Sequence, residues 1–156
     1  MEYIVGMGEF VVAGGEDDTI RTFALASCVA VTVYSPVKRA AGMIHVVLPS
    51  PLDNKDVTER PSYFATTGIP MLIEAMRTKH GCRKEELQIH MYGGAESMLQ
   101  QDIYNVGKKN IDAVKRTLMD LGLSIHKADL RGSDSRSICM QVKTGAVEVY
   151  RQPIQR

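Results

Sequence analysis

The sequence lacks an excess of charge of either sign, and it lacks long hydrophobic runs. Its 156 residues include 19 Lys and Arg against 18 Asp and Glu, which gives a formal net charge of +1. Nucleic acids and anionic membrane surfaces are bound largely through excess positive charge, so neither is expected as a partner. Apolar runs such as residues 43–48 fall far short of the roughly 20 residues that cross a bilayer. We therefore expect no transmembrane helix and no membrane insertion.

Cysteine is scarce as well. Cys28, Cys82 and Cys139 are an odd number and form no CxxC pair, which argues against a disulfide framework and against a cysteine-rich zinc site. Reduced thiols are typical of the cytosol, and the first residues carry neither the basic nor the long apolar region of a signal peptide. We therefore expect a cytoplasmic protein, in which Cys82 and Cys139 are packing residues or exposed thiols.

The composition is otherwise that of a folded globular protein. Hydrophobic residues make up 44% and charged residues 24% of the chain, whereas disordered chains have too little apolar surface to offset their conformational entropy. The length is that of one ordinary domain, and no internal repeat or low-complexity linker interrupts it. A single domain over residues 1–156 is expected, with a monomer as the simplest state.

Runs of β-branched and small apolar residues predict three strands, over residues 4–12, 28–34 and 42–48. The polar, proline-containing segment 35–39 predicts a turn that joins the second and third strands as a hairpin. Cys28 lies near the start of one hairpin strand and His45 in the middle of the other. Whether they meet depends on the register, because a slip of one residue reverses the faces of a strand.

Two helices are expected from apolar residues spaced at three and four positions. The first follows a polar surface loop over residues 49–60, must begin or kink at Pro70 and ends at Gly81. The second has Asn105 as a candidate cap and Gly122 as its stop. Their apolar faces are formed by Phe64, Ile69, Leu72, Ile73 and Met76 in the first helix and by Ile111, Val114, Leu118 and Leu121 in the second.

Further strands are expected over residues 87–92, 123–128, 137–142 and 146–150, the last two joined as a hairpin. Strands at both ends of the chain surround two helices, a pattern typical of the α+β class. The sequence therefore predicts a layered α/β sandwich with a largely antiparallel sheet and two main helices.

Cys28 is the best candidate nucleophile. Small residues precede it and let a backbone or substrate come close, and His45 is the nearest histidine in the expected hairpin that can serve as its base. Thr22 can orient that histidine through its hydroxyl or carbonyl group, which would complete a nucleophile, a base and an orienting group. A buried core cysteine and a hydrogen-bonded core histidine are the plain alternatives.

No other motif indicates a cofactor. His80, His90 and His126 form no HxxxH or HExxH pair, so a metal site is not expected. Residues 6–8 lack the third glycine of a dinucleotide-binding loop, and the glycines at 93–94 are not followed by the Gly-Lys-Ser/Thr of a phosphate-binding loop. We expect neither a metal nor an organic cofactor.

Several motifs occur in order along nearly the whole chain: GMGE at residues 6–9, LASCVAV at 25–31, HVVLP at 45–49, YFA at 63–65, GGAESM at 93–98 and NVGKKN at 105–110. On these motifs together the sequence resembles the chemoreceptor glutamine deamidase family, CheD, of bacterial and archaeal chemotaxis. The resemblance implies a fold of the Cys-His-Thr deamidase type.

The resemblance also implies a catalytic triad of Cys28, His45 and Thr22. Cys28 would form a thioester with His45 as base and acid, and the Cys28 backbone N–H is the expected oxyanion donor, with a second donor unidentified. The sequence departs from the family at Ala26, where glycine usually precedes the Ser-Cys pair. It departs again in the late loop over residues 130–136, which lacks the usual glycine-rich segment but keeps Arg136.

The implied substrate is a set of glutamines on the cytoplasmic helices of chemoreceptors, converted to glutamate with release of ammonia during chemotaxis adaptation. Glutamate methyl esters at the same positions are a second implied substrate class, and a CheC-type phosphatase is the implied protein partner. Two alternatives stay open: a chemotaxis adaptor with weak or no catalysis, and a thiol hydrolase that acts on a different amide.

Overall fold

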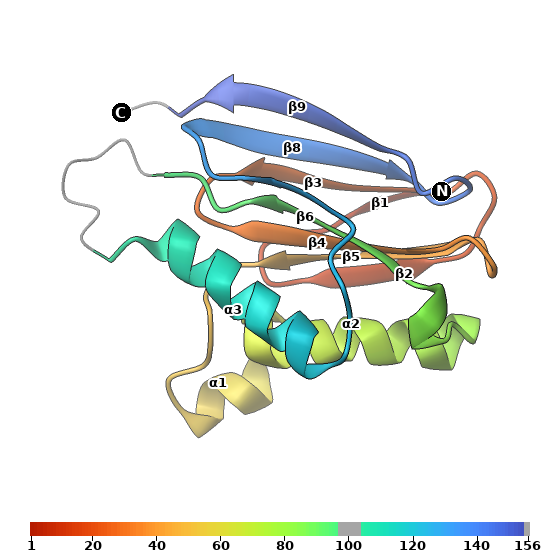
Figure 1. Ribbon diagram of the computed structural model, residues 1–156, viewed down its shortest axis with the longest axis horizontal. Helices are drawn as coiled ribbons and strands as arrows, with labels where there is room; N and C mark the ends of the chain where they lie inside the picture. Colours follow the sequence, from red (N-terminus) through yellow and green to blue (C-terminus); the bar gives the residue numbers. More distant parts are fainter. Residues whose placement is uncertain (97–103, 155–156) are drawn as a thin grey trace.

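The computed structural model describes residues 1–96 and 104–154, which form two stacked β-sheets with helices on one side (Figure 1). Sheet A has the strand order β1-β3-β8-β9, formed by β1 (Glu2–Ile4), β3 (Thr19–Leu25), β8 (Asp134–Gln141) and β9 (Val147–Pro153). Sheet B has the order β2-β5-β4-β6-β7, formed by β2 (Phe10–Ala13), β5 (Ala40–Val46), β4 (Val29–Ser35), β6 (Gln88–Gly93) and β7 (Lys127–Leu130). Neighbouring strands are antiparallel, apart from the parallel pairs β1–β3 and β6–β7.

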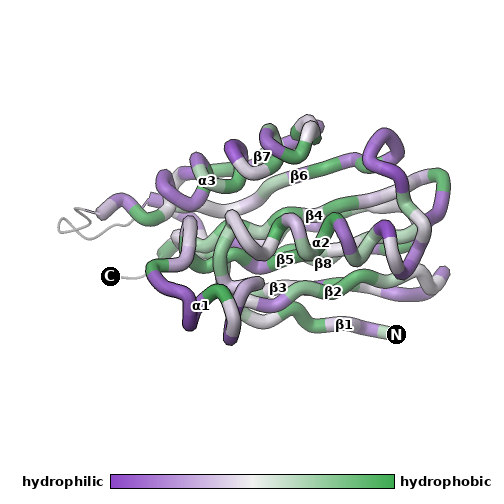
Figure 2. Tube along the Cα trace, turned by 90° about the horizontal axis from the view of Figure 1, so that it is seen from below, coloured by the Kyte–Doolittle hydropathy of each residue, from purple (hydrophilic) through white to green (hydrophobic). Residues whose placement is uncertain are grey.

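Helices cover the face of sheet B that is turned away from sheet A (Figure 1). The two main helices are α2 (Ala65–His80) and α3 (Val106–Asp120), and the shorter segments are α1 (Asn54–Glu59), η1 (Pro61–Tyr63) and η2 (Lys84–Glu86). Hydrophobic and hydrophilic residues alternate along α2 and α3 in Figure 2, as expected for helices that pack through one face. In the described part of the chain, no helix is long and apolar enough to cross a membrane.

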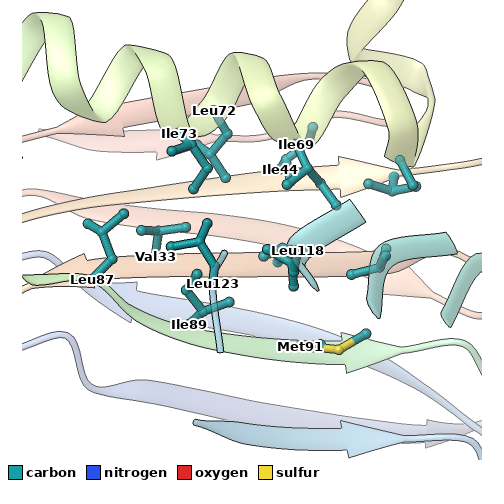
Figure 3. Packing of buried hydrophobic residues seen from close by; sticks show 14 of the residues in the cluster. Val33, Ile44, Ile69, Leu72, Ile73, Leu87, Ile89, Met91, Leu118 and Leu123 are labelled. Atoms are coloured by element: carbon teal, nitrogen blue, oxygen red, sulfur yellow. The ribbon is translucent and has the colours of Figure 1, made fainter. Parts of the chain in front are cut away.

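Buried apolar side chains form two layers. Figure 3 shows the layer between the helices and sheet B, where Leu72 of α2 and Leu118 of α3 belong to one cluster with Ile44 and Ile89 of the strands. The second layer lies between the two sheets, and Ile20 of β3 is fully buried in it. Sheet B is therefore covered on both faces, whereas sheet A packs through one face.

Strand β4 contributes to both layers. Val29, Val31 and Val33 belong to the helix side, whereas Cys28 and Ala30 belong to the layer between the sheets. Successive side chains of a strand point to opposite faces, and this alternation was the basis for predicting the strand. The expected hairpin of β4 and β5 is confirmed, and its register places Ala30 opposite His45.

The predicted layered α+β fold, with mostly antiparallel strands and two main helices, is confirmed, and its strands are divided over two sheets. Gly81 ends α2 with a φ of 67°, as expected. Pro70 does not start this helix, which already begins at Ala65. Asn105 precedes α3 as expected, but its side chain makes no capping hydrogen bond.

Two of the expected strands differ in the structure, and one strand was missed. Residues 4–12 form two strands in different sheets, because a turn around Gly8, with a φ of 74°, separates β1 from β2. Residues 123–126 are not a strand: the Leu123 N–H is bonded to the Leu118 carbonyl at the end of α3, and pairing in β7 begins only at Lys127. Strand β3 was not predicted.

The segment 49–60, expected to be a loop, contains the short helix α1. Asp53 precedes this helix and its carboxylate accepts a hydrogen bond of 2.9 Å from the Asp56 N–H. A side-chain acceptor at this position satisfies a donor that the first helical turn leaves unpaired. A capping aspartate therefore explains why helix forms in a polar, proline-flanked segment.

Candidate active site

The chain that leads into β4, residues 26–28, is held by hydrogen bonds to three consecutive carbonyl groups. We call this segment the Cys28 loop. The Ala26 carbonyl accepts from the Ala95 N–H at 2.7 Å, and the Cys28 carbonyl accepts from the Gly94 N–H at 2.8 Å. Between them, the Ser27 carbonyl accepts from Nδ2 of Asn110 at 2.9 Å. The backbone next to the candidate nucleophile is therefore fixed before any substrate binds.

The contacts from β6 require glycine. Gly93 has a φ of 107°, and a Cβ atom there would lie 2.3 Å from the Cys28 carbonyl oxygen. Side chains are excluded by such an approach and by such a backbone conformation. The glycine motif at residues 93–98 therefore lets the end of β6 pack closely against the Cys28 loop. The last two residues of this motif, Ser97 and Met98, lie outside the described residues.

The register of β4 and β5 places Cys28 and His45 on one face of sheet B. His45 is opposite Ala30, and Cys28 shares the face of Ala30 because it lies two residues before it. Diagonal neighbours of this kind are separated by roughly 7–8 Å at the backbone and are within reach of long side chains. Cys28 is 8% exposed and His45 is 2% exposed, so both lie in the layer between the sheets.

Thr22 reaches His45 from the opposite sheet. Its hydroxyl Oγ1 lies 2.7 Å from His45 Nδ1 and 2.7 Å from the Val5 carbonyl oxygen. A carbonyl can only accept, so the single hydroxyl proton is donated to Val5. Oγ1 must then accept from Nδ1–H of His45. This assigns the Nδ1–H tautomer and leaves the lone pair on Nε2, a buried atom with no hydrogen-bond partner in the described residues.

Burial sets the protonation states of the pair. It raises the pKa of the Cys28 thiol from 9.0 to about 11, and it lowers the pKa of the His45 imidazole from 6.5 to about 4. Both shifts have the same cause, because removal from water penalises the charged form of each group. Near neutral pH the site therefore holds a neutral thiol and a neutral imidazole whose Nε2 can accept a proton.

Arg136 and Arg131 fix the late loop against the glycine segment. Arg136 is buried, donates to the Arg131 carbonyl at 2.7 Å and forms an ion pair with Asp129 at 3.3 Å. Arg131 in turn donates to the Gly94 carbonyl at 3.1 Å. Arg136 therefore belongs to a structural network that reaches the neighbours of the Cys28 loop.

The remaining cysteines and histidines lie elsewhere. Cys82 is buried in the layer between the helices and sheet B, and Cys139 is buried on β8. Nδ1 of His90 lies 3.2 Å from the Tyr92 hydroxyl, and Nδ1 of His126 accepts from a backbone N–H of β6 at 3.2 Å. Among residues 1–96 and 104–154, no three His, Cys, Asp or Glu side chains gather as metal ligands would.

Sequence reasoning missed Asn110 and Val5. Asn110 is fully buried on α3 and contacts the Cys28 loop directly. One signal for it was present, because Asn110 is a polar residue next to Ile111 and four residues before Val114, within the apolar stripe of the helix. Val5 contributes a backbone carbonyl to the Thr22 hydroxyl, and sequence carries no signal for such a role.

The chain is similar in sequence to several known proteins and similar in fold to a solved structure. The family model for CheD chemotactic sensory transduction matches residues 47–151. The chain is 41% identical over 151 residues to the probable chemoreceptor glutamine deamidase CheD of Syntrophotalea carbinolica, covering 95% of this chain and 93% of that protein. It is 35% identical over 149 residues to the chemoreceptor glutamine deamidase CheD of Thermotoga maritima, covering 96% and 91%.

Among solved structures, the fold is similar to that of the hypothetical protein YfiH of Bacillus licheniformis, with a TM-score of 0.52 and 11% identity. That match covers 78% of this chain and 49% of the YfiH chain, and it concerns the fold alone. The two sequence matches extend over nearly the whole length of this chain and of each relative. The chain therefore belongs to the CheD family.

Proposed function

We propose that the protein is a cysteine-dependent deamidase that converts glutamine side chains of chemoreceptors to glutamate. The names of its relatives specify this reaction for them. The observation that supports it most strongly here is the Thr22–His45 hydrogen bond, which leaves Nε2 of His45 unprotonated on the face that carries Cys28. We place the reaction in the cytoplasm, as part of chemotaxis adaptation.

The two pKa values indicate how the thiol is activated. Burial raises the pKa of the Cys28 thiol and lowers that of the His45 imidazole, so both shifts oppose the transfer of the proton from sulfur to Nε2 in the resting site. A preformed thiolate and imidazolium pair is therefore costly in this site. Cys28 instead attacks the amide carbon as its proton moves to Nε2 of His45, which is general-base catalysis coupled to bond formation.

The remaining steps return both groups to their starting state. The tetrahedral intermediate collapses as His45 donates its Nε2 proton to the leaving nitrogen, so the C–N bond breaks and ammonia departs from a Cys28 thioester. Water then attacks the thioester carbon while Nε2 accepts a proton. The C–S bond breaks, the sulfur recovers its proton, and the products are glutamate and ammonia.

Thr22 acts by orientation and by charge stabilisation. It holds the imidazole through Nδ1, and its oxygen accepts from the Nδ1–H that becomes more acidic when His45 is protonated. The backbone N–H of Cys28 is the proposed donor to the oxyanion of each tetrahedral intermediate. The site draws on residues from β3, the Cys28 loop, β5 and α3 of one chain, so we propose that residues 1–156 act as one domain and as a monomer.

The test is mass spectrometry of a chemoreceptor cytoplasmic fragment incubated with the protein. Conversion of an amide to an acid at specific glutamines is expected with the wild-type protein and is expected to be lost with Cys28→Ala. Cys139→Ala is the matched control, because Cys139 is also a buried free thiol but lies on β8 outside the site. Turnover by Cys28→Ala at the native rate would contradict the proposal. A glutamate methyl ester at the same position tests whether the thioester route also releases methanol.

One observation favours a second function. Cys28 is only 8% exposed and its pKa is raised, so an adaptor that binds receptors or a CheC-type phosphatase, with weak catalysis, is the second candidate. Binding of a folded protein to the receptor fragment, with no mass change at any glutamine, would favour the adaptor. Deamidation of unrelated amides in place of receptor glutamines would point to a thiol hydrolase of different specificity.

A further inference from the structure

Asn110 links the loop that carries the candidate nucleophile to the end of the strand that carries the candidate base. Its Nδ2 donates to the Ser27 carbonyl at 2.9 Å and to the Val47 carbonyl at 2.9 Å. Ser27 immediately precedes Cys28, and Val47 lies two residues after His45. Asn110 is fully buried on α3. A single side chain of the helix therefore joins the Cys28 loop to the end of β5.

The Asn110 side chain bonds the two segments just beyond the point where backbone pairing between β4 and β5 ends. The last paired residues of β4 and β5 at this end are Val29 and Val46. Beyond them, the Ser27 and Val47 carbonyls are satisfied by the two hydrogens of one amide group. The other amide atom, Oδ1, is buried without a hydrogen-bond partner in the described residues, an unfavourable arrangement because a buried acceptor has lost its water. The contribution of the Asn110 side chain at this position is therefore its two donated hydrogen bonds, since its acceptor atom is unused.

The bond to Ser27 also fixes the direction of the Cys28 N–H. The Ser27 carbonyl and the Cys28 N–H belong to one peptide unit, and no peptide bond in the described residues is cis. In a trans peptide unit the C=O and N–H bonds point in opposite directions. Because Asn110 draws the Ser27 carbonyl toward α3, the Cys28 N–H points away from α3. No backbone acceptor in the described residues takes this N–H.

We propose that Asn110 is a positioning residue that orients the Cys28 N–H toward the oxyanion formed during deamidation. The Ala95 and Gly94 N–H groups hold the carbonyls on either side of Ser27, so Asn110 is the side-chain clamp between two backbone clamps. Its donation also polarises the shared peptide unit and strengthens the N–H as a donor. The inference rests on the proposed role of Cys28.

Two variants test this role. Asn110→Asp keeps the shape of the side chain but replaces the donating amide with an oxygen, and Asn110→Ala removes both donations without burying a charge. Thr117→Ala is the matched control, because Thr117 is buried on the same helix and bonds the Ala113 carbonyl within α3 at 2.7 Å. Circular dichroism and thermal unfolding identify the variants that fold, and Asn110→Ala serves where Asn110→Asp does not.

The readout compares two reactions of Cys28. Deamidation of a receptor fragment passes through an oxyanion, whereas alkylation of the Cys28 sulfur by iodoacetamide is a displacement at a saturated carbon and needs no oxyanion donor. We expect the Asn110 variants to lower kcat for deamidation by about 10²-fold, with KM and the alkylation rate of Cys28 unchanged. Mass spectrometry of the Cys28 peptide separates its alkylation from that of Cys82 and Cys139. Thr117→Ala should keep the native kcat.

Two results would overturn the inference. An unchanged kcat in a folded Asn110→Ala protein would show that the N–H needs no such clamp. A parallel loss of kcat and of Cys28 alkylation would show that Asn110 maintains the sulfur or the fold and not the oxyanion donor. Failure of the proposed function is distinguishable, because the wild-type protein would then not deamidate the fragment or Cys28→Ala would still do so.

Discussion

The neutral state of buried His45 makes a quantitative prediction about stability. Its pKa is 6.5 when solvated and about 4 in the folded protein. Between pH 4 and pH 6.5, the unfolded chain therefore binds a proton at His45, whereas the native protein does not. The stabilising contribution is fully present above pH 6.5 and is lost as the pH falls toward 4. At ~1.4 kcal/mol per pKa unit, the loss is about 3 kcal/mol at pH 4.

The assay compares urea unfolding of the wild-type protein and His45→Asn at pH 7, 5.5 and 4. Asparagine places an amide nitrogen near the position of Nδ1, so it can still donate to Thr22, but it does not titrate. All other titratable groups are common to the two proteins, and their effects cancel in the difference. We expect the wild-type advantage in unfolding free energy to shrink by about 3 kcal/mol between pH 7 and pH 4, with about half of this loss by pH 5.5.

A difference that stays constant from pH 7 to pH 4 would refute the reasoning. It would mean that His45 carries the same charge in the folded and unfolded chains, so that the imidazole is either solvated or paired with a group that stabilises its cation. The expectation that burial keeps His45 neutral well below neutral pH would then lose its physical basis.

Three further outcomes follow from the same contacts. The pH profile of kcat/KM should stay level near neutrality and fall as the pH drops through about 4, when His45 becomes protonated and cannot accept the thiol proton; a fall centred near 6.5 would contradict this. Thr22→Val should destabilise the fold by about 2–4 kcal/mol, because the Val5 carbonyl and His45 Nδ1–H both lose their buried partner, and it should lower kcat more than it raises KM. Ala24→Gly should raise the unfolding free energy by up to about 1 kcal/mol, because Ala24 has a φ of 56°, which glycine adopts without strain. Ala26 does not have a positive φ, so Ala26→Gly should lower the unfolding free energy. Thermal or urea unfolding of the two variants measures both changes.

The parts of the fold that follow local periodicity could be predicted from the sequence. In β4, Val29, Val31 and Val33 pack on the helix side and alternate with residues that face the second sheet, such as Ala30. In α3, the apolar spacing marks the buried face. Strand β3 could not be recognised in this way, because its register shifts between Thr22 and Leu25 and leaves Phe23 and Ala24 exposed. A bulge of this kind interrupts alternation at the strand that carries Thr22.

The candidate site depends on pairings that local sequence does not encode. His45 and Thr22 are 23 residues apart and lie in different sheets, so their contact results from the stacking of the sheets. The residues themselves suggested this constellation but left an ordinary core histidine as the alternative, and the resemblance to CheD proteins was what favoured His45 as a base. Asn110 and the Ser27 carbonyl are separated by 83 residues, and the polar residue in an apolar helix stripe was the local sign of that contact.

The position of the site at one end of the sandwich reconciles its burial with its chemistry. Because β4 is antiparallel to both β5 and β6, the start of β4 and the ends of β5 and β6 lie at the same end of sheet B. Cys28, His45 and Gly93 therefore lie near that end. Glutamine carries its amide beyond two methylene groups, so a glutamine substrate under the proposed function would not need to bring its backbone to a sulfur that is only 8% exposed. The interior that raises the Cys28 pKa and lowers the His45 pKa also strengthens each hydrogen bond to the developing charges. Burial disfavours the ionised forms of Cys28 and His45, and this is the reason for proposing a concerted proton transfer in place of a resting ion pair.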